Sequence, residues 1–256
     1  MTDFVILLFG PFFLGLAFSY AGATTFESFF HDQILDISKE RAALFYRLRK
    51  IAPGFWNIHV AHGVLHHHKT FKSSYARQFD EPGERARLIT QLRCGFSDRT
   101  VEDFCKSKFG ASFTPKGYIF YGFPIYAPPL VSAFFLPPIS VAAIALASMI
   151  AASPFFIFSR WAHPFMHMRF AEMSDRAPRW IRIILSSDYG VAIRISHWVH
   201  HRHPRYNLNL QYGADLIRGR FRAPSATEYD AMVRDGVIEP RHRRRFEGRR
   251  FLLHQF

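Results

Sequence analysis

The sequence predicts an all-α integral membrane protein with about three to four transmembrane helices and a cytoplasmic, histidine-rich cap. Three observations lead to this prediction: two long segments without basic residues, a strongly basic remainder, and 14 histidines that gather in a few short stretches. The chain of 256 residues is 49% apolar, which is too apolar for a disordered protein. We treat residues 1–256 as a single domain.

Basic residues avoid two zones of the chain. The 33 Lys and Arg outnumber the 20 Asp and Glu, and a net charge of +13 would on its own suggest a nucleic-acid partner. None of the 33 lies in residues 1–23 or 117–159, however, so apolar and basic segments alternate along the chain. This alternation is typical of a membrane protein, and we expect no nucleic-acid partner.

Both zones are long enough to cross a membrane. Residues 4–23 match the roughly 20 residues that one helix needs, and the uncharged residues 117–159 leave room for two helices. Proline pairs divide the second zone, which predicts spans at about 4–23, 117–136 and 139–158. A cleaved signal peptide is the alternative for the first span, but Asp3 and the lack of a basic amino-terminal region favour an anchor.

One crossing followed by a helical hairpin places segments 24–116 and 160–256 on the same side of the membrane. They carry all of the Lys and Arg, so the positive-inside rule predicts that both segments, with their histidines, are cytoplasmic. The basic tail, residues 223–256, is expected to be solvated or to lie on an anionic surface. Cys94 and Cys105 are expected to be free thiols in this compartment.

Most of the histidines lie in residues 59–68, 163–167 and 197–203. On an α-helix, residues spaced by three, four or seven share a face, so each stretch is expected to present a stripe of imidazoles. The stripes are His59, His62 and His66; His163 and His167; and His197, His200 and His201. Imidazole is the commonest metal ligand near neutral pH, and this many rings exceed the four ligands of one zinc ion. The pattern therefore predicts two metal ions rather than a solvated, histidine-rich surface.

Three histidine motifs resemble those of a known superfamily. The run from His197 to Asn207 (HWVHHRHPRYN), the run from His62 to Lys69 (HGVLHHHK) and the run from Glu27 to Asp36 (ESFFHDQILD) carry the resemblance, together with the pair at His163 and His167. Their order is similar to that of the membrane-bound fatty acid hydroxylase/sterol desaturase superfamily. The similarity extends over about residues 25–222, including the segment Leu210–Phe221 after the last motif.

This resemblance implies a fatty-acid-hydroxylase-like domain with a non-haem diiron centre beneath a small bundle of membrane helices. Splitting O2 to attack an unactivated C–H bond requires an oxidising metal centre with open coordination positions. The resemblance implies two iron ions, O2 and electrons from a separate protein of the cytochrome b5, ferredoxin or reductase type. The implied ligands are His31, His59, His62, His66, His67, His163, His167, His197, His200 and His201.

Two departures from the family pattern leave ligand assignments open. The second motif has an extra residue, so either His62, His66 and His67 keep the family roles or the stripe that begins at His59 supplies the ligands. In the first motif Asp36 stands where the family has a second histidine. His31 and Asp36 lie about 140° apart on an α-helix, so both can reach one centre only if the helix ends or bends between them. Glu27 shares a face with His31, and we therefore expect Asp36 to be the weaker candidate.

Each ligating ring should donate its second N–H to a carboxylate or carbonyl group. The candidate carboxylates are Glu27, Asp36, Asp188 and Asp215, while His203 lies off the face of its neighbours and is either a ligand, a ligand's partner or structural. The expected function is hydroxylation of a lipid-like substrate, with desaturation or carotenoid or sterol oxidation as the alternative. Two other classes stay open: a zinc-binding, redox-inactive membrane protein or hydrolase, and a basic membrane-surface protein with incidental histidines.

Overall fold

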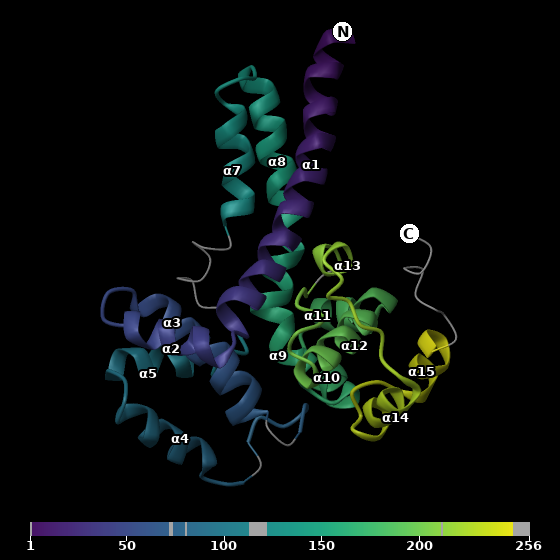
Figure 1. Cartoon of the computed structure of the whole chain (residues 1–256). Coiled ribbons are helices and arrows are strands. Elements are labelled where there is room, and N and C mark those ends of the chain that lie inside the picture. Colours follow the sequence, from purple (N-terminus) through teal and green to yellow (C-terminus); the bar gives the residue numbers. More distant parts are fainter. Residues whose placement is uncertain (1, 72–73, 80, 113–121, 211, 248–256) are drawn as a thin grey trace.

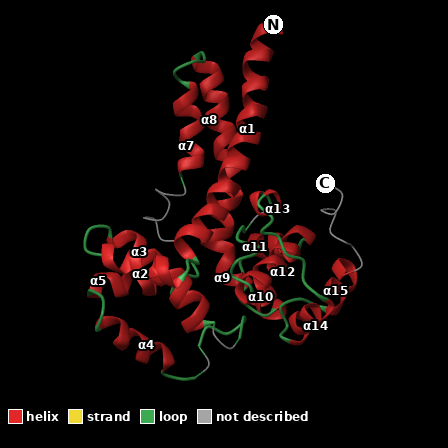
Figure 2. Cartoon of the chain, viewed as in Figure 1, coloured by secondary structure: helices red, strands yellow, loops and turns green. Residues whose placement is uncertain are grey.

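Every regular element of the computed structural model is helical within the part that it describes, which is residues 2–71, 74–79, 81–112, 122–210 and 212–247 (Figures 1 and 2). The all-α prediction is confirmed for these ranges. In chain order the α-helices are α1 (Thr2–Phe30), α2 (Lys39–Leu48), α3 (Pro53–His59), α4 (Glu84–Arg93), α5 (Asp98–Lys106), α7 (Phe123–Ser132), α8 (Pro138–Phe156), α9 (His163–Met166), α10 (Phe170–Arg176), α11 (Arg179–Ser186), α12 (Asp188–Arg202), α13 (Ala214–Ile217), α14 (Ala226–Arg234) and α15 (Pro240–Glu247).

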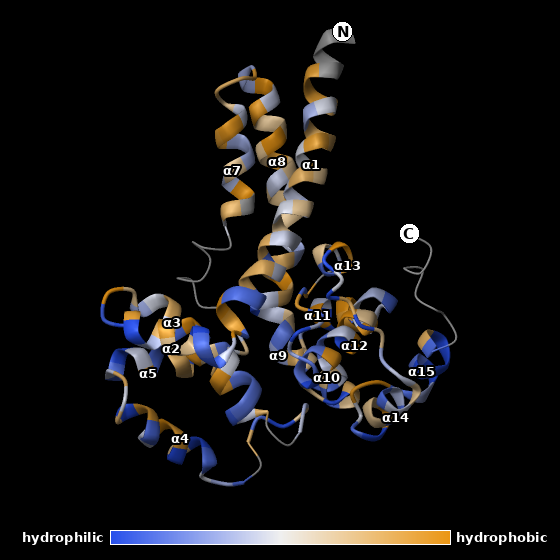
Figure 3. Ribbon diagram, in the orientation of Figure 1, coloured by the Kyte–Doolittle hydropathy of each residue, from blue (hydrophilic) through white to orange (hydrophobic). Residues whose placement is uncertain are grey.

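Helices α1, α7 and α8 form a stalk that stands above the other helices, which we call the cap (Figure 1). The stalk is largely apolar, whereas the cap mixes hydrophilic and hydrophobic residues (Figure 3). Small residues bring the two long helices together, because a Cβ atom on Gly15 of α1 would lie 3.1 Å from Ile144 Cα and 3.2 Å from Ala147 Cβ. Close backbone approach at small residues is typical of helix pairs in membranes.

Two stretches in the described part of the chain are long and apolar enough, by length and composition, to cross a membrane. They are Leu7–Leu35 and Pro138–Met166, and they contain most of the first predicted span and all of the third. The second predicted span, 117–136, is not among them. Residues 117–121 lie outside the described part, and α7 has ten residues, about 15 Å of helix against a hydrocarbon core of about 30 Å. In the described part of the chain, two of the expected three to four spans therefore have candidate helices.

The cap contains two hydrophobic cores. One joins α4, α5 and the segment around Val60 through Leu65, Leu92 and Phe104. The other is larger and surrounds Trp198 of α12. The described portion of the predicted basic tail, 223–247, is folded rather than loosely solvated, because Tyr229, Met232 and Phe246 on α14 and α15 are buried in this second core.

Three segments of the described chain are π-helices rather than α-helices: η1 (His31–Leu35), η2 (Val60–Thr70) and η3 (Ile157–Ala162). Each of them contains predicted metal ligands or ends directly before one. A π-helix closes i→i+5 hydrogen bonds, is rare, and often occurs at functional sites. The α-helical spacing therefore fails in the first two histidine motifs, on η1 and η2, where residues five apart come onto one face.

Candidate metal centre

The structure brings together nine of the ten histidines predicted as ligands and adds Asp36. Their ligand atoms form three overlapping sets in which all atoms lie within 4.8 Å of one another. The five-histidine group consists of His66, His163, His167, His197 and His201. The aspartate group consists of His31, Asp36, His62 and His200. The bridging trio consists of His62, His66 and His67, and so shares one histidine with each of the other two.

Some histidines stay outside these groups. His59, proposed as part of a stripe with His62 and His66, places its Nδ1 atom 2.8 Å from the carbonyl oxygen of Leu35. The stripe is wrong as a geometric prediction, because η2 begins directly after His59 and changes the angular repeat. His203 pairs through Nε2 with Glu228 Oε1 at 2.9 Å, and His68 is exposed.

Helix α12 supplies three of the grouped histidines, and its amino-terminal end is fixed by a cap and a close backbone contact. Its first turn is capped by the Ser187 hydroxyl, which accepts a hydrogen bond from the backbone N–H of Gly190 at 3.1 Å. Gly190 is required there, because a Cβ atom would lie 2.1 Å from the carbonyl oxygen of Ile184 on α11. This contact sets the position of α12 against α11.

Arg194 ties α12 to the segment that carries His163 and His167. Its side chain is fully buried and donates to the carbonyl oxygens of Phe165 at 2.9 Å, Met168 at 2.7 Å and Val237 at 3.0 Å. The Phe165 carbonyl also accepts from the backbone N–H of Met168 at 3.2 Å, so Arg194 reinforces the turn that ends α9. Sequence pattern alone does not indicate this role, because a single arginine within a helix has many uses.

The π-helices explain why residues five apart meet. His62 and His67 lie on η2, and their Nε2 atoms are 3.2 Å apart. On η1, the backbone N–H of Asp36 donates to the carbonyl oxygen of His31 at 2.8 Å, which closes an i→i+5 turn. His31 and Asp36 thus join the same group, and the expected ranking that put Asp36 behind Glu27 is wrong. The Glu27 carboxylate instead accepts from Leu210 N–H at 2.9 Å and from Asn209 Nδ2 at 3.0 Å.

The centre of the five-histidine group is a triangle of ring nitrogens. The Nε2 atom of His163 lies 2.8 Å from that of His197 and 3.3 Å from that of His167, and the remaining side measures 3.0 Å. His66 and His201 approach through their Nε2 atoms at 3.1 Å. Two ligands placed about 2.1 Å from one ion lie roughly 3.0–3.4 Å apart, so the observed spacing suits a shared metal ion.

Backbone carbonyls determine which ring nitrogen carries the proton. The Nδ1 atoms of His31, His167 and His200 lie 3.0–3.2 Å from the carbonyl oxygens of Glu27, Tyr75 and Tyr206, respectively. A carbonyl only accepts, so Nδ1 is the donor and Nε2 is left with a lone pair directed into its group. Backbone carbonyls thus accept the second N–H of these rings, as expected from the sequence. The candidate carboxylates have other partners: Asp188 pairs with Arg245, and Asp215 accepts from Ser28 and Asn209.

Burial and crowding keep these rings neutral. Burial, followed by the influence of neighbouring imidazoles, holds the pKa of His66, His197 and His201 well below 6.5. Burial likewise lowers the pKa of His167 to about 3 and that of His200 to about 4. Metals bind the neutral imidazole, so the centre is ready for coordination at neutral pH without proton loss.

Among the described residues, several buried polar atoms have no hydrogen-bond partner, and five of these atoms belong to the metal groups. The set includes Asp36 Oδ2, His66 Nδ1, His67 Nδ1, His163 Nδ1 and His200 Nε2. Buried polar atoms are nearly always satisfied in folded proteins. His200 Nε2 and Asp36 Oδ2 face each other at 3.5 Å, too far for a good hydrogen bond but suitable for two ligands of one cation. The residues therefore fit a metal centre.

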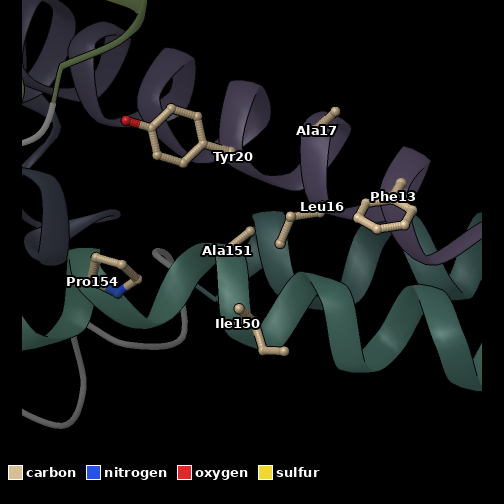
Figure 4. Close-up of a pocket in the computed structure, with 7 residues that line it drawn as sticks. All are labelled: Phe13, Leu16, Ala17, Tyr20, Ile150, Ala151 and Pro154. Atoms are coloured by element: carbon tan, nitrogen blue, oxygen red, sulfur yellow. The ribbon is translucent and has the colours of Figure 1, made fainter. Parts of the chain in front are cut away.

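An apolar groove of about 430 Å³ lies between α1 and α8 (Figure 4). Tyr20 and Pro154 lie at the end of the groove nearer the cap, and the Tyr20 hydroxyl donates to the carbonyl oxygen of Tyr212. The lining residues are Phe13, Leu16, Ala17, Tyr20, Ile150, Ala151 and Pro154. Both helices continue from this groove into segments that carry members of the metal groups.

Known proteins offer no independent assignment of this centre. Comparison with family models, with curated proteins and with solved structures finds no match to the chain. The interpretation therefore rests on the motifs of the sequence and on the geometry of the buried groups.

Proposed function

We propose that this protein is an O2-dependent, non-haem diiron oxygenase that hydroxylates a C–H bond of a hydrophobic, lipid-like substrate. The main support is the pair of buried ligand groups joined by His62, His66 and His67, which lies where two apolar helices enter the cap. The resemblance of the histidine motifs to membrane-bound hydroxylases and desaturases points the same way. Two irons bound there would supply the reduction of O2 and the oxidation of the C–H bond.

The residues of the chain supply orientation and exclusion of water. Carbonyl acceptors hold His31, His167 and His200 with Nε2 directed inward, so the ligand atoms are arranged before a metal binds. The rings are almost completely buried, which limits water at the centre and protects a reactive oxidant from side reactions. The outcome, hydroxylation or desaturation, depends on how substrate hydrogens lie against this centre.

The groove between α1 and α8 supports a lipid-like substrate. Its lining is aliphatic and aromatic apart from the hydroxyl of Tyr20. Between helices of a bundle such grooves suit apolar ligands. We propose that a separate electron-transfer protein docks on the cap, whose arginines would attract an acidic partner.

Metal and oxygen measurements on the full chain test this function. The protein is purified anaerobically in detergent, iron and zinc are counted, and O2 consumption is followed with a chemical reductant and a panel of acyl lipids, sterols and carotenoids. We expect about two irons per chain and substrate-dependent O2 uptake. The exposed His68 provides a control, since His68→Ala should retain both properties. Zinc alone, with no O2 uptake, would support the redox-inactive alternative instead.

We also propose that the protein is a multi-pass membrane protein with a cytoplasmic cap. Reporters fused after Phe256 and within residues 77–99 should both be cytoplasmic, and a reporter near Pro137 should lie on the opposite side. The basic character of both cap segments is the physical reason. If the first two reporters fall on opposite sides, the histidine motifs are separated by the membrane and the proposed centre cannot form.

A further inference from the structure

The two ligand groups differ in charge. The five-histidine group offers only neutral imidazoles, whereas the aspartate group combines three imidazoles with one carboxylate. Among the described residues, Asp36 is the one acidic side chain in any of the three sets. A carboxylate oxygen favours harder metal ions than imidazole does and cancels part of their charge. The two positions are therefore chemically unequal.

Asp36 lies between the aspartate group and the bridging trio. One carboxylate oxygen, Oδ2, lies 3.5 Å from Nε2 of His200, a member of the aspartate group. The other oxygen, Oδ1, lies 3.6 Å from Nε2 of His67, a member of the bridging trio. The turn closed by the Asp36 N–H and the His31 carbonyl holds the carboxylate in this place.

No described arginine or lysine pairs with Asp36, although its neighbour on η1 has two such partners. Asp32 contacts Arg218 Nη2 at 3.0 Å and Arg220 Nη2 at 3.5 Å. The side chain of Asp36 is 5% exposed, and its Oδ2 atom is buried without a hydrogen-bond partner. An unpaired carboxylate in such surroundings costs several kcal/mol unless a cation offsets it. A metal ion between Asp36 and His200 would provide that cation.

We propose that Asp36 is a direct metal ligand and the single anionic ligand of the centre, and that it makes the ion of the aspartate group the more tightly held of the two. This assignment rests on the proposed metal centre but not on iron or on catalysis. It holds for any divalent ion that accepts imidazole and carboxylate ligands. Asp36→Asn should therefore weaken one position and leave the other unchanged.

Cobalt(II) binding to the metal-free full chain in detergent tests the assignment without any activity measurement. Equilibrium dialysis counts the ions, and the visible spectrum of cobalt reports each coordination sphere. We expect two ions in the wild type, and in Asp36→Asn one unchanged ion and one bound on the order of 10–100-fold more weakly. Asp32→Asn, the same change four residues earlier on η1, should bind both ions normally.

Asp36→His places at this position the residue type that the family has there. This second variant keeps the test informative if Asp36→Asn does not fold. It should restore two-ion binding while changing the spectrum of one position only. Two ions with wild-type affinities and spectra in Asp36→Asn, or an unchanged spectrum in Asp36→His, would overturn the assignment. A wild-type chain that takes up no cobalt would overturn the metal centre itself, and the assignment with it, so the two failures are distinguishable.

Discussion

The stalk and the cap bury polar side chains in different ways. In the stalk, the hydroxyl oxygens of Ser19 and Ser148 are 2.7 Å apart, Ser148 also donates to the carbonyl oxygen of Ile144, and Ser140 donates to the carbonyl oxygen of Leu7. In the cap, by contrast, lie all of the buried side-chain atoms that lack a partner among the described residues. Most of them belong to the histidine groups or to residues packed against them.

This difference separates architecture from function. Large apolar residues face outward on the stalk, where Phe18 is 70% exposed, while small and hydroxyl-bearing residues lie inside. That arrangement is expected where the surroundings are hydrocarbon and helices associate through small residues and hydrogen bonds. The buried serines of the stalk already have hydrogen-bond partners within the stalk. The cap brings ring nitrogens and a carboxylate oxygen together without partners among the described residues, an arrangement that a bound cation would stabilise.

Removing a ligand of the cap should have the largest effect. His197→Ala deletes one corner of the Nε2 triangle, so we expect loss of metal from the five-histidine group and a fall in turnover on the order of 100-fold or more. Metal analysis and O2 uptake measure both effects. As a control in the stalk, replacing the buried Ser148 by alanine should leave the metal content unchanged. Full metal and turnover in His197→Ala would refute the site.

A matched pair of glycines tests whether the stalk and the cap respond independently. A Cβ atom on Gly63 would lie 2.3 Å from the carbonyl oxygen of Leu35, so Gly63→Ala should push η2 away from η1 and disturb the aspartate group. We expect a loss of about 1–3 kcal/mol of stability together with one metal ion. In the stalk, Gly15→Ala meets looser contacts and should cost less while both ions stay bound. Equal metal content in both variants would contradict this separation.

The pH dependence of the metal-free protein should come mainly from the cap. Burial holds the pKa of His167 at about 3 and that of His200 at about 4, against an ordinary value of 6.5. As the pH falls below about 6.5, the unfolded chain takes up protons that the folded chain does not, so stability falls by up to about 1.4 kcal/mol per pH unit for each such ring. The raised pKa values of the buried Asp36 and Asp215 act in the opposite direction, but the histidines with a lowered pKa are more numerous.

Denaturation of the metal-free protein at pH 7.5, 6.5 and 5.5 measures this effect. Stability should be nearly constant between the first two values and should drop at the third. Bound metal should delay the drop to lower pH, because ions compete with protons for the same lone pairs. A flat profile in the metal-free protein would mean that the rings are not buried as neutral groups.

Composition and spacing were sufficient to predict the all-α class and the two long apolar helices, because these follow from runs of apolar residues. Together with the family resemblance, which implied His31 and His67, they also selected nine of the ten residues in the three metal groups, since imidazoles that cluster in sequence tend to share a site. The register failed at His59 and Asp36, where π-helices replace the α-helical repeat and no residue type announces the change. Carbonyl partners such as Tyr75 and Tyr206 could not be predicted, because every residue has a backbone carbonyl.

The smallest effect is expected for a cap histidine that hydrogen-bonds to a backbone carbonyl, as the stalk serines do. The His59 ring donates from Nδ1 to the carbonyl oxygen of Leu35, and it belongs to none of the metal groups. His59→Ala should therefore cost about 1–2 kcal/mol of stability, the usual result of removing a buried hydrogen bond, and should leave both ions and most of the activity in place. His67→Ala, by comparison, removes a member of the bridging trio and should lower metal content. Metal analysis with thermal denaturation of the two variants decides between the two registers of the second motif. If His59→Ala loses metal and His67→Ala does not, the stripe that begins at His59 supplies the ligands. In that case a histidine with a hydrogen-bond partner binds the metal, and the contrast between satisfied and unsatisfied polar groups fails in the cap.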